Sequence, residues 1–88
     1  MPQLSLEPEE FEKTSLEFRD AAKQLVEMGG RLDERIETLA KTWEQSSEHE
    51  LIKIYKEWRV QIGEFATNLD KIAEQFEAVT ESLYKADS

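Results

Sequence analysis

Residues 51–83 read LIKIYKEWRVQIGEFATNLDKIAEQFEAVTESL, and large apolar residues recur in this stretch at alternating intervals of four and three. A 4-3 repeat places its members on one face of an α-helix. No proline interrupts the stretch, and Gly63 lies off the repeat. The pattern predicts one long helix from about 48 to 85. Its apolar seam consists of Leu51, Tyr55, Trp58, Ile62, Phe65, Leu69, Ile72, Phe76, Val79 and Leu83.

The positions on either side of this seam are almost all uncharged. Among positions 52, 54, 59, 61, 66, 68, 73, 75, 80 and 82, only Arg59 carries a charge. Two-stranded coiled coils normally have charged residues there, whereas a wide uncharged stripe is typical of a four-helix bundle. Because a two-helix hairpin cannot cover so wide a stripe, we expect a second hairpin to cover it.

The first half of the chain carries a second 4-3 repeat. Pro8, followed by Glu9 and Glu10, suits a first helical turn, where proline and carboxylates are favourable. The repeat predicts a helix from about 8 to 42. Its large apolar members are Phe11, Phe18, Leu25, Leu32, Ile36 and Leu39. The interleaved series begins with small residues that allow a close helix approach: Ser15, Ala22 and Gly29.

Gly29 and Gly30 allow two interpretations. Two glycines within a helix cost about 2 kcal/mol relative to alanine, so a break here would give three helices. We expect one unbroken helix, because the heptad phase continues through the pair without a skip.

The boundary between the two predicted helices lies at about 43–47. Ser47 and Glu50 have the spacing of a capping box, which marks the start of the second helix. A short turn makes the helices antiparallel neighbours, each about 50–57 Å long. We therefore predict an all-α fold, an antiparallel helix-turn-helix hairpin that dimerises into an elongated four-helix bundle. The alternative is a monomeric hairpin from a longer helical protein, such as a spectrin-like repeat.

Composition limits the classes of function. The 88 residues form one domain, and the net charge of −9 disfavours binding to nucleic acid or to anionic membranes. We expect no membrane span and no ordinary signal peptide, because the chain has neither the apolar run nor the basic start that these require. There is no cysteine, and His49 is the only histidine. We expect no catalytic, cofactor or metal site, and hence no enzyme.

The order of landmarks resembles the WXG family, the small ESAT-like proteins of type VII secretion. The chain is close to one hundred residues long and opens with Leu6-Glu7-Pro8-Glu9-Glu10-Phe11. Trp43 falls near the middle, at the predicted turn. An aromatic-rich second helix ends close to Tyr84. These features cover almost the whole chain.

Two family motifs are altered in this chain. The family's Trp-x-Gly turn is replaced by Trp43-Glu44-Gln45, which lacks the glycine. The family's Tyr-x-x-x-Asp/Glu export signal corresponds to Tyr84 and Asp87, where the acid comes one residue early. The resemblance implies that Trp43 and Gln45 lie near Tyr84 and Asp87 of a partner.

The resemblance also implies a function. Such proteins form homo- or heterodimeric bundles and are exported folded by an ATPase-driven membrane machine in Gram-positive and related bacteria. The partner is then a second copy, a related hairpin or the N-terminal domain of a toxin. The chain is accordingly expected to be a secretion substrate, or the targeting partner of one, and to be cytoplasmic before export. The competing hypothesis is a cytoplasmic helical adaptor or chaperone-like module unrelated to secretion.

Overall fold

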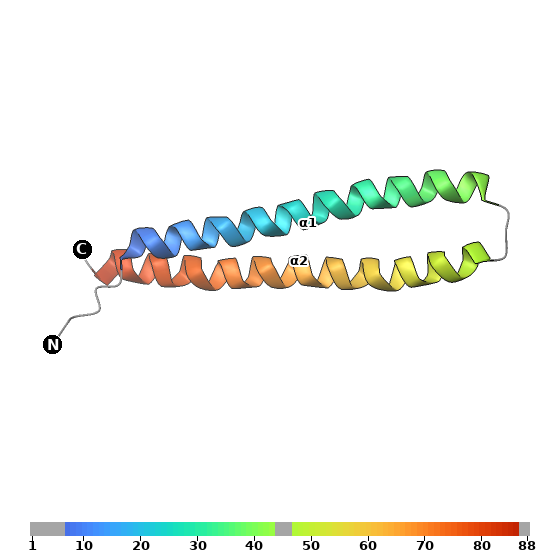
Figure 1. The fold of residues 1–88 in the computed structure, drawn as a ribbon. Helices are drawn as coiled ribbons and strands as arrows, with labels where there is room; N and C mark the ends of the chain where they lie inside the picture. The colour runs from blue at the N-terminus through green and yellow to red at the C-terminus, as the bar shows by residue number, and fades with distance from the viewer. Residues whose placement is uncertain (1–6, 44–46, 87–88) are drawn as a thin grey trace.

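The computed structural model describes residues 7–43 and 47–86, which form two antiparallel helices (Figure 1). Helix α1 spans Pro8–Thr42 and helix α2 spans Ser47–Ala86. Pro8 stands at the start of α1, with Glu9 and Glu10 in the first turn, where their charges favour the positive end of the helix dipole. The predicted all-α hairpin is confirmed, and no strand occurs among the described residues.

Helix α1 continues without a break through Gly29 and Gly30, so the three-helix interpretation is wrong. Neither glycine has a positive φ. Helix α2 begins one residue earlier and ends one residue later than the expected range of 48 to 85. Glu44 and Gln45, which belong to the predicted turn motif, lie outside the described residues.

The hairpin is a thin rod. Its principal extents are 67 × 20 × 18 Å, and its radius of gyration is 20.1 Å. A compact chain of this length would have a radius of gyration of about 12 Å. A rod of two helices encloses little volume, and this limits how much apolar surface the hairpin buries by itself.

Small residues form the line of closest approach between the helices. On α1 these residues are Ser15, Ala22 and Gly29, and on α2 they are Ala66, Ala73 and Thr80. Each set recurs every seven residues and therefore follows one face of its helix. The described residues include no large side chain that is fully buried. The hairpin is thus held together by close backbone approach rather than by a core of large side chains.

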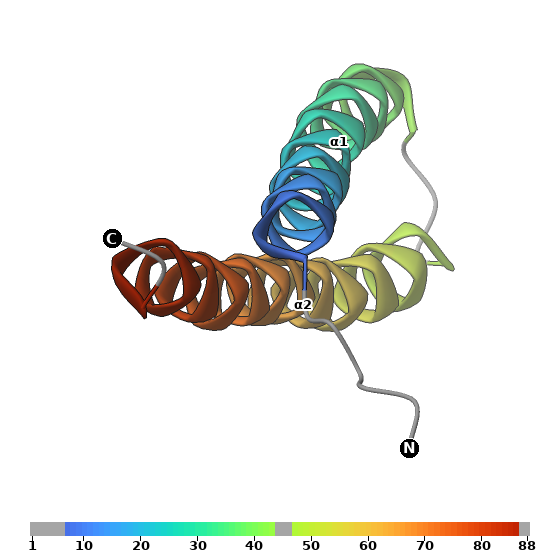
Figure 2. The ribbon, with the colours of Figure 1, turned by 90° about the vertical axis from the view of Figure 1, so that its left-hand side faces the viewer.

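Larger side chains flank this line, most closely near the chain ends. The ring of Phe76 lies 5.7 Å from that of Phe18 and 5.9 Å from that of Phe11, centroid to centroid. These separations are typical of favourable aromatic pairs. The two helices cross at an angle, as the end-on view shows (Figure 2): α1 and α2 run in different directions across it, although they lie side by side along the rod (Figure 1).

Candidate functional site

The apolar seam of α2 is divided between two environments. Half of its members are half-buried against α1: Tyr55, Ile62, Leu69, Phe76 and Leu83. The other half are exposed along one face of the rod: Leu51, Trp58, Phe65, Ile72 and Val79. Phe65 is 57% exposed and Ile72 is 40% exposed, although both belong to residue types that normally avoid water. We call this second set the open stripe.

The open stripe borders a hollow at the middle of the rod. Phe65 and Leu69 of α2 line it together with Ala21, Leu25 and Met28 of α1. Three polar residues complete the lining: Gln24, Glu27 and Arg31. The exposed face therefore spans both helices. A contiguous exposed apolar patch bordered by polar residues is the usual mark of a protein interaction site.

A second apolar hollow lies between the helices near the turn, with a volume of about 470 Å³. Both tryptophans, Trp43 and Trp58, line it, and so do Leu39 and Leu51. Trp43 ends α1 in an extended conformation and is half-buried. At this position Trp43 closes the apolar side of α1 next to the turn, and part of its side chain stays accessible.

The predicted seam of α1 lies mainly between the helices. Five of its members are half-buried: Phe11, Phe18, Leu25, Leu32 and Ile36. Leu39 is exposed at the rim of the hollow near the turn.

Arginine side chains bridge the two helices at two places. Arg19 of α1 reaches α2, with N–O distances of 3.2 Å to Asp70 and 2.7 Å to Glu77. The hydrogen bond to Glu77 is the main cause of a raised pKa at Arg19. Such half-exposed pairs fix the relative position of the helices more than they stabilise the fold.

The second arginine bridge is a polar cluster. Arg59 Nε donates to Asp33 Oδ1 at 3.0 Å, and the Tyr55 hydroxyl donates to the same carboxylate. The hydrogen bond from Tyr55 is the larger cause of a lowered pKa at Asp33, and that from Arg59 adds to it. Burial, together with the Asp33 charge, raises the pKa of Tyr55. These groups satisfy one another, and this arrangement fits a structural bridge.

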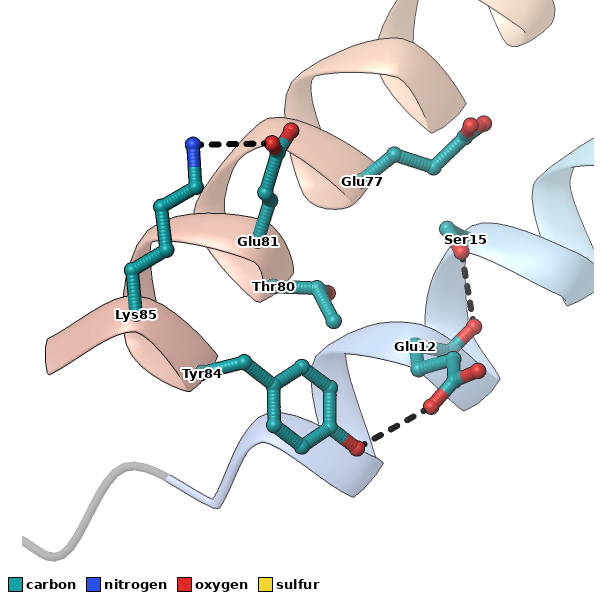
Figure 3. A pocket seen from close by; sticks show the side chains of 7 residues that line it. All are labelled: Glu12, Ser15, Glu77, Thr80, Glu81, Tyr84 and Lys85. Atoms are coloured by element: carbon teal, nitrogen blue, oxygen red, sulfur yellow. Dashed lines mark hydrogen bonds and ion pairs between the residues drawn. The ribbon is translucent and has the colours of Figure 1, made fainter. Parts of the chain in front are cut away.

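Tyr84, the predicted export residue, lies in the last turn of α2, close to the start of α1 (Figure 3). Trp43 follows the end of α1 and is therefore at the opposite end of the rod. Its hydroxyl donates to Glu12 Oε2 at 3.2 Å. Burial and the Glu12 charge raise its pKa. Tyr84 stays 46% exposed and borders a hollow with Ser15 and Thr80. Asp87, the second predicted export residue, lies outside the described residues.

Two features of the site were not predicted from the sequence. The division of the α2 seam into an inner and an open half was missed, although Ala66, Ala73 and Thr80, at intervals of seven, mark the face that packs inward. The arginine bridges were also missed. Arg59 is the only charge among the positions that flank the α2 seam, but helix periodicity does not identify Asp33 as its partner.

Residues 7–43 and 47–86 contain no cluster of His, Cys, Asp and Glu suited to a metal ion. Neither helix is long and apolar enough to span a membrane.

Solved structures with the same fold come from two bacilli. EsxA of Geobacillus thermodenitrificans is 26% identical, with a TM-score of 0.86, over 97% of this chain and 92% of that one. ESXB of Bacillus anthracis str. Sterne, described as a secreted protein, has a TM-score of 0.89 at 18% identity, and both chains are covered completely. The second similarity shows the fold alone.

The remaining comparisons concern sequence. No curated protein matches the chain. The family model for WXG100, proteins of 100 residues with WXG, matches residues 3–88. The chain therefore belongs to the WXG100 family, the small helical-hairpin proteins associated with type VII secretion.

Proposed function

We propose that this protein is a type VII secretion substrate, or the targeting partner of one, and that it acts by pairing its open face with another helical hairpin. The observation that carries the proposal is that the hairpin buries small side chains and leaves large apolar side chains exposed. Among the described residues, the buried apolar ones are alanines, whereas Trp58, Phe65 and Ile72 stay exposed along one face. A stable hairpin needs a partner to remove that surface from water.

The site fits binding better than catalysis. The Asp33, Tyr55 and Arg59 cluster is internally paired, and the open face offers apolar side chains rather than a nucleophile with a base. Membership of the WXG100 family supports export without a signal peptide, from a Gram-positive or related bacterium. The hairpin would be cytoplasmic before export, and the secretion ATPase would be its transient partner.

The positions of Trp43 and Tyr84 support pairing as part of the export signal. Trp43 follows the last residue of α1 and Tyr84 lies in the last turn of α2, so the two residues are at opposite ends of a rod 67 Å long. They can form one recognition surface only if a partner hairpin lies antiparallel to this one. The proposal therefore makes export depend on both the tail and the open face.

Export from the native host tests the proposal. Removal of residues 84–88 is expected to retain the protein in the cell at its normal level. Glu12→Ala is the matched control, because it removes the acceptor of the Tyr84 hydroxyl but keeps the tail. That variant is expected to be exported.

Two results would count against the proposal. Unchanged export of the truncated protein would show that the tail is not a signal. A wild-type protein that stays in the cell while other substrates of the same secretion ATPase are exported would favour the cytoplasmic adaptor instead.

A further inference from the structure

The side of the rod opposite the open stripe carries exposed apolar residues of its own. At 3.6 residues per turn, the position before an inward-facing residue lies on one side of the helix, and the first and fourth positions after it lie on the other. The open stripe occupies the positions before, such as Phe65 before Ala66. Val60 and Val26 occupy positions after, and 61% and 58% of their surfaces are exposed. Pairing through the open stripe leaves this side, which we call the back face, uncovered.

We propose that the back face binds the back face of a second copy of this chain. The two rods lie antiparallel, with α1 on α1 and α2 on α2, and a two-fold axis passes between them. The contact is separate from the open stripe. It therefore goes beyond the proposed function and applies whichever hairpin pairs with that stripe.

The first support comes from charges on α1. Lys23, Gly30 and Glu37 recur every seven residues and follow the back face, because each comes directly after an inward-facing position. A two-fold axis at Gly30 would bring each Lys23 to Glu37 of the other copy, so opposite charges would meet twice. Both charged residues are exposed. Within residues 7–43 and 47–86, neither takes part in a recorded ion pair.

The same order of lysine, glycine and acid recurs on α2. Lys56, Gly63 and Asp70 are again seven residues apart, each four positions after an inward-facing one. A two-fold axis at Gly63 would bring each Lys56 to Asp70 of the other copy. Lys56 is exposed, and the recorded contact of Asp70 with Arg19 uses Oδ1 alone. Both helices therefore carry charges that complement themselves in an antiparallel stack.

The central glycines allow the two rods to approach closely. A Cβ built on Gly30 or on Gly63 would have no neighbouring atom within 4 Å, so neither glycine makes room for another part of the hairpin. Neither has a positive φ. A glycine inside a helix lowers helix stability relative to alanine, and the hairpin alone gives no reason for either one. A second backbone that packs over both positions supplies that reason.

A single axis serves both helices. Arg59 of α2 binds Asp33 of α1 and lies against Gly29, so this part of α2 is level with that stretch of α1. Gly63 follows Arg59 by one helical turn, about 6 Å along the rod. Gly30 and Gly63 are therefore at nearly the same height, and an axis that passes between them satisfies both charge patterns.

The charges further along the back face favour the antiparallel stack over one with the same ends together. Towards the chain ends α2 carries Glu74 and Glu81 on this face, and towards the turn it carries Lys53. A stack with the same ends together would place Glu81 over the first turns of α1, near Glu12 of the other copy. The antiparallel stack instead brings Glu74 close to Lys53, because the two lie almost equally far from Gly63 along the chain.

The central part of the back face is small, so the stack is weak. From Lys23 to Glu37 it is about 21 Å long at the helical rise per residue. With the 20 Å width of the rod this gives about 400 Å² per copy, half of a standard specific interface. The net charge of −9 adds repulsion between copies, which salt at 0.15 M screens beyond about 8 Å. Stacking is therefore expected near millimolar rather than micromolar concentration.

Sedimentation equilibrium of Phe65→Asp tests the stack, because that substitution removes pairing through the open stripe. Ile72→Asp, on the same stripe, provides a second background. In both, the protein should change from monomer to dimer as its concentration rises to about 1 mM. Gly30→Gln, added to either background, should abolish this dimer while helix content by circular dichroism is kept, because the longer side chain separates the two backbones.

Charge reversal in the same backgrounds tests the arrangement. Lys23→Glu and Glu37→Lys should each weaken the dimer by about tenfold, because each puts like charges together twice. A mixture of the two variants should restore the affinity, because both contacts again join opposite charges. Arg31→Glu and Glu17→Lys are the controls. They make the same changes of charge at exposed positions of α1 that point away from the back face, and should leave the dimer unchanged.

Three results would overturn the inference. They are a protein that stays monomeric at about 1 mM in both backgrounds, a dimer that tolerates Gly30→Gln, and a mixture of the charge variants that associates no better than either alone. The proposed function rests on the open stripe and on the tail, so each of these results would leave it standing.

Discussion

The guanidinium of Arg59 occupies the space that a side chain at Gly29 would need. A Cβ built on Gly29 would lie 2.6 Å from Nη2 and 2.8 Å from Nε of Arg59. From this position Arg59 reaches across α1 to Asp33. A glycine is thus needed at position 29 because Arg59 of α2 fills the space of a side chain there. The backbone of Gly29 does not itself require glycine, because its φ is not positive.

The adjacent glycine provides a matched comparison. No atom lies within 4 Å of a Cβ built on Gly30. Gly30→Ala should therefore raise the free energy of unfolding by about 1 kcal/mol, through helix propensity alone. Gly29→Ala should raise the free energy of unfolding by less, because the Arg59 guanidinium must move away from the new methyl group and lose its ion pair with Asp33. Urea unfolding at one protein concentration measures both.

The same two substitutions, made in a protein that also carries Arg59→Ala, test whether Arg59 causes the difference between Gly29 and Gly30. Without the guanidinium, Gly29→Ala and Gly30→Ala should stabilise the protein equally. If Gly29→Ala stays the less favourable change there, the explanation through Arg59 is wrong.

Stability should depend on the charge of Asp33. Its pKa in the folded protein lies below the ordinary value of 3.8, so folding favours the charged carboxylate. That contribution is fully present above about pH 4 and disappears as the pH falls through the folded pKa. Asp33→Asn should lower the free energy of unfolding at neutral pH, and its difference from wild type should shrink in acid.

Unfolding in urea at a series of pH values from 7 to 3 checks this. Glu34→Gln, a change at an exposed neighbouring carboxyl, is the control and should show no comparable trend. A wild-type advantage over Asp33→Asn that stays constant down to pH 3 would contradict the assigned role.

Because the helices approach closely at Ala73, whose exposure is 0%, a larger side chain at this position should strongly lower the stability of the hairpin. Ala73→Leu should force the helices apart and cost roughly 1–3 kcal/mol, the usual cost of overpacking. Ala78→Leu adds the same atoms at an exposed position of the same helix and should change stability little. Thermal unfolding compares the two, and equal melting temperatures would refute the small-residue contact.

The two halves of the α2 seam should respond differently to a charge. Ile62 is half-buried against α1, and Ile62→Asp should unfold the hairpin. Phe65 is on the open stripe, and Phe65→Asp should leave the helices intact while it prevents pairing. Circular dichroism reports the first effect. Loss of helix in Phe65→Asp at the level seen for Ile62→Asp would show that Phe65 supports the hairpin itself.

Periodicity was enough to predict two long antiparallel helices, because an α-helix is the regular structure in which a 4-3 repeat places its apolar residues on one face. It was not enough to predict which half of each stripe faces inward. Tyr55 and Trp58 look equivalent in sequence, and the assignment depends on where α1 approaches α2 most closely. Ala66, Ala73 and Thr80 decide that, because only their small side chains permit the approach.

The bridges across the helices depend on a different property, the offset between α1 and α2. Arg19 reaches Asp70 and Glu77 only at the offset that this hairpin adopts. A turn one residue longer or shorter would shift the helices by about 1.5 Å and change those distances. The positions of Trp43 and Tyr84 at opposite ends, by contrast, follow directly from the hairpin and were predictable.

Sedimentation of the wild-type protein and of Phe65→Asp at micromolar concentration tests most directly whether the open stripe is the pairing surface. The account predicts twice the chain mass of 10.3 kDa for wild type, and a helical species of 10.3 kDa for the variant. A folded wild-type protein that sediments at 10.3 kDa, or a Phe65→Asp variant that sediments as a dimer, would contradict it.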